Sequence, residues 1–204
     1  MTQSFFPAWA ACIALSLAAP SATARPTEES KRLMTHRNTE QYEVQKAEST
    51  IKAGASRVHV RAPSSVVKKV VLDFAAYERF ISEFEKSRVV GKKDDKTDVY
   101  LQVPILHGAA KIWAVVRFEP PKAVSEDEEV VSAHMLTGNV KRLDATWRIR
   151  KIDDENTQLQ LEMLIVPKLP FPGSIITGEV SRAAKFAVRG SRDRAENAMK
   201  SKGN

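Results

Sequence analysis

The spacing of apolar residues changes along the chain, and these changes predict where strands and helices lie. From about residue 88 to 166, apolar and polar residues alternate in segments that charged or glycine-containing turns separate, as in Leu159, Leu161 and Met163. A period of two is typical of strands with one buried face, and the short turns predict antiparallel hairpins. Together with a first strand at residues 56–61, this pattern predicts a strongly twisted sheet of about six or seven strands.

Apolar residues recur at helical spacing in three other segments. Residues 63–73 and 77–84, directly after the first strand, predict two short helices, and Pro63 suits the first turn of the first helix. After Pro172, a segment without proline continues to about Lys200, with small apolar residues on one side and basic residues on the other. This segment predicts one long amphipathic helix.

These elements predict a single α+β domain at residues 55–200. A long helix that follows a run of antiparallel strands packs on the concave face of their sheet, because both must bury an apolar surface. A twisted sheet around such a helix leaves apolar space between the two, which is a common kind of ligand site. We therefore expect a cavity between the apolar faces of the strands and the small residues of the last helix.

The residues before this domain divide into two segments. Residues 1–24 have the features of a secretory signal peptide, because the apolar run from Phe5 to Ala19 precedes a small-x-small cleavage site that ends at Ala24. An uncleaved membrane anchor is the alternative, although the run is short for a span of about 20 residues. Residues 25–54 are polar, and Tyr42, Val44 and Ile51 are candidates to begin a strand. We expect a loop or tether at Glu28, Glu29, Lys31, Arg32 and Arg37. The protein is expected to be exported, either to the periplasm or as a secreted protein.

Charge and cysteine content limit the partners and the chemistry. The chain of 204 residues has a formal net charge of +7, which favours anionic partners such as lipid head groups. Cys12, its one cysteine, lies in the signal segment, so the rest of the chain has no disulfide and no thiolate. Nucleic acid is not expected as a partner, because no stacking aromatic residues are interleaved with the basic ones. We expect a monomer.

The basic face of the last helix allows two interpretations. It is either an ordinary solvated face or a surface that docks on an anionic membrane, where each basic residue contributes roughly 1 kcal/mol. The residues of this basic stripe are Arg182, Lys185, Arg189 and Arg192.

Few residues have a pattern that predicts catalysis or metal binding. No two of the four histidines have helical metal-ligand spacing, and we expect neither a metal nor a cofactor. His134, on a strand, either faces solvent or points into the cavity, where it could polarise a bound carbonyl. Asp144 alternates out of phase with Trp147, which places it on the outer face, in a cross-strand ion pair near Arg142 and Arg148. The inverted phase would make these charged residues a polar patch inside the cavity.

Two local motifs resemble those of a known superfamily. Residues 60–67, Val-Arg-Ala-Pro-Ser-Ser-Val-Val, are similar to a strand-to-helix entry that ends in Ala-Pro, and residues 72–80 look like the segment after the first helix. Both resemble the START-like (SRPBCC) superfamily of helix-grip proteins, which includes polyketide cyclase/dehydrase and Coq10-like lipid-binding members. The resemblance covers about residues 56–199. It implies the helix-grip fold and a hydrophobic ligand, and it carries over no catalytic residue, because the superfamily shares no catalytic motif.

The favoured hypothesis is an exported protein that holds a hydrophobic small molecule, a lipid or an isoprenoid-like compound, for transport. The alternatives are a cyclase- or hydrolase-like enzyme that acts on an apolar substrate in the same cavity, and an interaction protein that docks on membranes. The side chains expected to contact the ligand are Leu101, Val103, Ile112, Ala114, Val116, Met135, Trp147, Leu161, Met163, Val180, Ala183 and Ala184.

Overall fold

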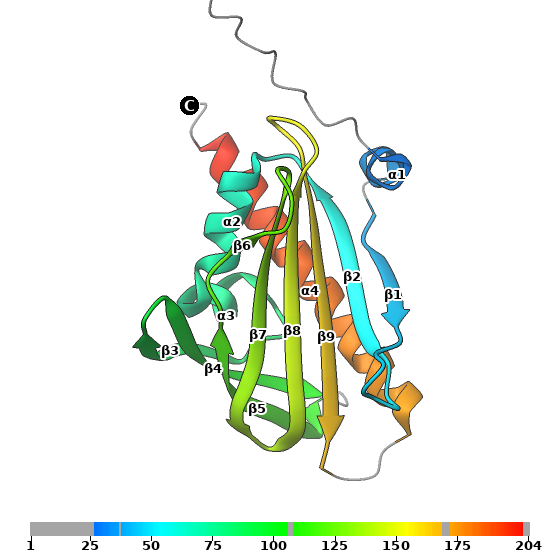
Figure 1. The fold of residues 1–204 in the computed structure, drawn as a ribbon, viewed down its shortest axis with the longest axis vertical. Helices are drawn as coiled ribbons and strands as arrows, with labels where there is room; N and C mark the ends of the chain where they lie inside the picture. Colours follow the sequence, from blue (N-terminus) through cyan, green and yellow to red (C-terminus); the bar gives the residue numbers. More distant parts are fainter. Residues whose placement is uncertain (1–26, 37, 106–107, 169–171, 202–204) are drawn as a thin grey trace, which may run out of the picture.

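The protein is described by a computed structural model that covers residues 27–36, 38–105, 108–168 and 172–201 (Figure 1). The expected signal segment, residues 1–24, lies outside the described residues. In chain order the elements are helix α1 (Glu28–His36), strands β1 (Glu40–Val44) and β2 (Ala53–Val60), helix α2 (Ser64–Leu72), the 3-10 turn η1 (Phe74–Ala76), helix α3 (Tyr77–Phe80), strands β3 (Lys86–Lys93), β4 (Lys96–Ile105), β5 (Ala110–Phe118), β6 (Lys122–Ala123), β7 (Glu128–Gly138), β8 (Val140–Lys151) and β9 (Thr157–Pro167), and helix α4 (Gly173–Lys200).

The strands form one antiparallel sheet of nine strands in the order β1-β2-β9-β8-β7-β5-β4-β3, with β6 paired to β7. The predicted α+β fold is confirmed. Helices α2 and α3 follow β2, the strand predicted at residues 56–61, and the long helix α4 packs along the sheet behind β9 (Figure 1). The sheet has more strands than the six or seven predicted. The additional ones are β1, where Tyr42 and Val44 were candidates to begin a strand, and β6, which has only two residues.

Alternation along the strands decides which side chains face α4. On β9, Leu159 and Leu161 are buried in the main apolar cluster, and Gln158 lies on the opposite, outer face. On β8, Trp147 is 2% exposed and belongs to the same cluster, whereas Asp144 is partly exposed and pairs with Arg142. The strand phase expected from the sequence is therefore the one observed for β8, and the inverted phase does not occur.

Helix α4 meets the rest of the molecule at two points where only glycine leaves enough room. Gly54 on β2 lies against Ser181, and a Cβ added to this glycine would overlap the backbone nitrogen of the serine. Gly190 lies against the end of α3, and a Cβ there would overlap the carbonyl oxygen of Phe80. These two close approaches fix the position of α4 against the sheet on one side and against α3 on the other.

The expectation of a loop or tether at residues 28–36 does not hold, because α1 forms there and joins the fold. The candidate strand at Tyr42 and Val44 is confirmed as β1. Arg37, also expected in the tether, lies outside the described residues.

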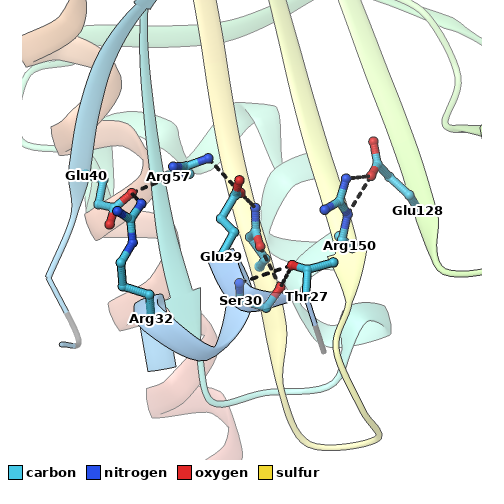
Figure 2. A network of polar contacts seen from close by, with 9 residues as sticks. Thr27, Glu29, Ser30, Arg32, Glu40, Arg57, Glu128 and Arg150 are labelled. Atoms are coloured by element: carbon cyan, nitrogen blue, oxygen red, sulfur yellow. Dashed lines mark hydrogen bonds and ion pairs between the residues drawn. The ribbon is translucent and has the colours of Figure 1, made fainter. Parts of the chain in front are cut away.

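Figure 2 shows how α1 is attached to the sheet. The Oγ of Ser30 donates to Oε1 of Gln158 at 2.9 Å, and Nε2 of Gln158 donates to Oε1 of Glu29 at 2.6 Å. Arg57 on β2 pairs with the same glutamate at 2.6 Å. Apart from the buried side chain of Leu33, polar contacts hold α1, which is why hydrophobic spacing did not predict it.

A search of the described helices for a membrane span found none that is long and apolar enough to cross a bilayer.

Candidate ligand-binding cavity

An apolar cavity lies between the first half of α4 and the inner face of the sheet. Its walls come from β4, β5, β8, β9, α3 and α4. The cavity has a volume of about 90 Å³, which is room for several water molecules, since one water needs roughly 10–15 Å³. Pockets for drug-sized ligands span roughly 300–1,000 Å³, so wall side chains must move apart before a long-chain molecule can enter.

The structure brings most of the predicted contact residues to this wall. These are Leu101, Val103, Ile112, Ala114, Val116, Trp147, Leu161, Met163, Val180 and Ala183. That they bind a ligand stays a prediction.

Met135 and Ala184 were also predicted to line the cavity, and the structure does not place them there. Met135 is partly buried and packs against the apolar cluster, and Ala184 is fully buried. Successive helical residues point about 100° apart, so Ala183 and Ala184 point in clearly different directions. Here Ala183 faces the cavity and Ala184 packs into the core.

Several wall residues were not predicted from the sequence. Tyr77 and Phe84 come from α3 and the loop after it, so their distance from the strands in the sequence gave no sign that they share a wall with them. Ile176 and Glu179 come from the first turns of α4. Ile176 had a usable signal, because it precedes the predicted Val180 by four residues, one helical turn. The remaining residues of this kind are Ile105, Phe118, Leu143, Ala145 and Ile165.

Tyr77 contributes a hydroxyl to the wall, but this group is already engaged. Its oxygen donates a hydrogen bond to the carbonyl of Val71 at 2.6 Å. The residue is buried, and burial raises the pKa of its hydroxyl far above the ordinary value near 10. The ring packs edge-on against Trp147, with ring centroids 6.5 Å apart. Tyr77 is therefore a neutral, fixed part of the wall and not a proton donor poised for catalysis.

Glu179 is the one charged residue among the described wall residues. Its Oε2 accepts a hydrogen bond from Nη2 of Arg182 at 3.0 Å, and Arg182 also pairs with Glu83 at 3.3 Å. The hydrogen bond to Glu179 is the largest cause of the raised pKa of Arg182, so this guanidinium stays charged. Arg182 thereby connects α4 to the loop after α3 beside the cavity.

The polar candidates for catalysis lie outside the cavity. His134 is on the outer face, its side chain is 48% exposed, and its Nδ1 is 3.9 Å from Glu119. Asp144 pairs with Arg142 along the same strand and not across strands as predicted, while Arg148 makes the cross-strand contact, to Glu128 at 2.9 Å. Across the described part of the chain, no group of histidine, cysteine and acidic residues is arranged to hold a metal ion.

The basic stripe on α4 is less uniform than its sequence indicates. Arg182 is engaged by two glutamates, and Arg192 pairs with Asp193 at 2.7 Å. Lys185 and Arg189 form no ion pair with another residue in the described ranges. The free positive charge of this stripe is therefore concentrated on these two residues.

Residues 60–188 match the family model described as "Polyketide cyclase / dehydrase and lipid transport", which is more than half of the chain. The protein belongs to this family. The matched region contains every described residue of the cavity wall, while α1 and β1 lie before it. No sequence among the curated proteins matches the chain.

Solved structures of low sequence identity share the fold. A STAR-related lipid transfer protein from Xanthomonas axonopodis has a TM-score of 0.65 at 14% identity, covering 77% of this chain and 93% of that chain. The Zhui aromatase/cyclase from a Streptomyces species has a TM-score of 0.61 at 18% identity, covering 79% and 96%. The lipid transfer and protein localization domain of human StarD13 has a TM-score of 0.62 at 19% identity, covering 76% and 83%.

These similarities place the chain in the START/SRPBCC superfamily, as the sequence motifs indicated, and the helix-grip fold is confirmed. Within the polyketide cyclase and lipid transport family, the same architecture serves ligand binding and cyclisation. The contents of the cavity must therefore decide between the two for this protein.

Proposed function

We propose that the protein binds a hydrophobic small molecule, a lipid or an isoprenoid-like compound, in the cavity beneath α4 and carries it as an exported protein. The apolar wall carries this proposal, because Glu179 is the one charged side chain among its described residues and the Tyr77 hydroxyl is already engaged. Each Å² of apolar surface that a ligand buries there contributes about 25 cal/mol. Export rests on the features of residues 1–24, and the lipid-transfer proteins that share the fold support the class of ligand.

The enzymatic alternative, a cyclase- or hydrolase-like activity, would need at least two polar groups that converge on the substrate. Among the described wall residues, the Tyr77 hydroxyl is bonded to the Val71 carbonyl and interacts with the Trp147 indole, so the Glu179 carboxylate is the one acid–base group left open to a substrate. His134 and Asp144, the acid–base candidates from the sequence, are on the outer face of the sheet. The geometry therefore favours binding over catalysis.

The identity of co-purifying molecules tests the binding function. Mass spectrometry of organic extracts of the purified protein should find a long-chain apolar compound at about one molecule per chain. Ala183→Phe, which fills the cavity from α4, should lose it. The matched variant Ala198→Phe, at an exposed position of the same helix, should keep it. Extracts without such a compound, or equal amounts in both variants, would contradict the proposal.

Docking on an anionic membrane is part of the proposed transport. Lys185 and Arg189 support it, because their charges are not neutralised by other described residues. In co-sedimentation with vesicles that contain anionic lipid, the double variant Lys185→Glu, Arg189→Glu should bind weakly and the unchanged protein strongly. Lys92→Glu, Lys93→Glu on β3 is the matched control for net charge. Equal loss in both double variants would show attraction by overall charge and no specific docking face.

A further inference from the structure

The cavity has a polar group at one end, and this group is acidic. Its described wall contains one carboxylate, on Glu179, and no lysine, arginine or histidine. The Glu179 side chain is 22% exposed, so this carboxylate lies where the apolar space meets solvent. A molecule that fills the cavity with its chain would place its head group beside this residue.

The carboxylate of Glu179 is partly available to a ligand. Its Oε2 accepts the hydrogen bond from Arg182, and its Oε1 has no hydrogen-bond partner among the described residues. A hydroxyl or ammonium group can donate to this oxygen. A ligand carboxylate has no proton to donate at neutral pH and would meet a like charge.

The cation next to Glu179 does not reverse this preference. Arg182 is shared between Glu179 and Glu83, at 3.0 and 3.3 Å, so two carboxylates surround one guanidinium. The Glu83 side chain is 17% exposed and thus also withdrawn from solvent, which limits screening. The three side chains together carry one net negative charge at this end of the cavity.

We propose that the cavity selects amphiphiles whose head group donates a hydrogen bond and carries no negative charge, and that Glu179 is the residue that makes this selection. The inference rests on the proposed binding function and names its ligand class. Long-chain alcohols and amines belong to the accepted class, and fatty acid anions are rejected. The apolar chain supplies the affinity, and the carboxylate of Glu179 distinguishes between head groups.

Displacement of a bound, uncharged apolar dye by ligands with the same chain tests the selection. Dodecanol, dodecylammonium and dodecanoate each have twelve carbons and differ at the first carbon, which bears a hydroxyl, an ammonium or the two carboxylate oxygens. We expect dodecanol and dodecylammonium to displace the dye at concentrations about tenfold lower than dodecanoate. Their head groups donate a hydrogen bond to the charged carboxylate of Glu179, whereas dodecanoate brings a second negative charge next to it. In Glu179→Gln the advantage over dodecanoate should fall to within about threefold.

Glu155→Gln, in the turn between β8 and β9, makes the same change in net charge at an exposed position and should keep the tenfold difference. Equal displacement by all three ligands in the unchanged protein would overturn the selection but leave the binding function intact. The selection by Glu179 would also be overturned, with the binding function intact, if Glu179→Gln still binds the dye and keeps the tenfold difference between the ligands. If the unchanged protein binds neither the dye nor any of the ligands, the proposed function fails and the selection with it.

Discussion

Helix α4 is amphipathic along its whole length, but its two halves have different surroundings (Figure 1). In the first half, Ile176, Val180 and Ala183 face the cavity. In the second half, Ala187 and Ala195 are buried in close packing. One side of the first half therefore borders open space, whereas no residue of the second half lines this cavity.

The contacts of the second half explain this difference. Gly190 lies against the Phe80 carbonyl, and the guanidinium of Arg194 lies 4.5 Å from the centre of the Phe80 ring and pairs with Asp73. Glu196 accepts a hydrogen bond from the backbone nitrogen of Arg61 at 3.0 Å. One end of the helix is thus fixed to α2 and α3, while the other end forms a wall that a ligand can press against.

The largest effect should come from the glycines of the two halves. Gly190→Ala should lower the free energy of unfolding by about 3 kcal/mol, because the new methyl group would overlap the Phe80 carbonyl and the backbone would have to shift. Gly178→Ala should raise it by about 0.5–1 kcal/mol, because its Cβ meets nothing within 4 Å and alanine favours the helix. Urea denaturation measures both. Equal effects would show that the two halves are packed alike.

The second largest effect should come from enlarging one alanine in each half. Ala187→Leu should cost about 2 kcal/mol, because Ala187 is 1% exposed and does not border the cavity. Ala183→Leu should cost less than about 0.5 kcal/mol, because its side chain extends into open space, and it should weaken binding of the apolar dye. Thermal unfolding and dye titration separate the two variants. A destabilised Ala183→Leu would contradict the open first half.

The smallest effect on stability should come from lowering the pH, because protonation of His59 adds one charge and removes no side chain. His59 is 5% exposed, its Nε2 lies 2.8 Å from Oδ1 of Asn156, and Glu196 of the second half interacts with it electrostatically. Burial is the largest cause of its lowered pKa.

The unfolded chain therefore binds a proton at higher pH than the folded protein does, so stability falls as the pH drops below about 6.5. The carboxylates with lowered pKa values, such as Asp98, change the pH dependence of stability only below about pH 4.5. His59→Gln should remove the loss between about pH 6.5 and 5. The prediction fails if this variant and the unchanged protein lose stability equally over that range.

The alternation of the strands allowed much of the fold and of the cavity wall to be predicted from the sequence. On β8 it distinguished the inward Trp147 from the outward Asp144, because a period of two leaves only two choices of face. The same rule placed Leu101, Leu161 and most of the other wall residues correctly.

The remaining features depend on how the elements pack. Whether Ala183 or Ala184 borders the cavity depends on the rotation of α4, which the contacts at Gly54 and Gly190 fix. Tyr77 reaches the wall only because α3 closes one side of it. Helix α1 is held by hydrogen bonds between residues far apart in the chain, and hydrophobic spacing carries no information about such contacts.

Amide hydrogen exchange along α4, measured with and without saturating dodecanol, tests the central claim most directly. If the ligand binds between the first half of the helix and the sheet, exchange should slow at residues 176–184 and on the inner strands β4, β5 and β9. Residues 187–200 should show no change, because their packing is complete without a ligand. Equal slowing in both halves, or slowing only at residues 187–200, would contradict a ligand cavity beneath the first half of α4.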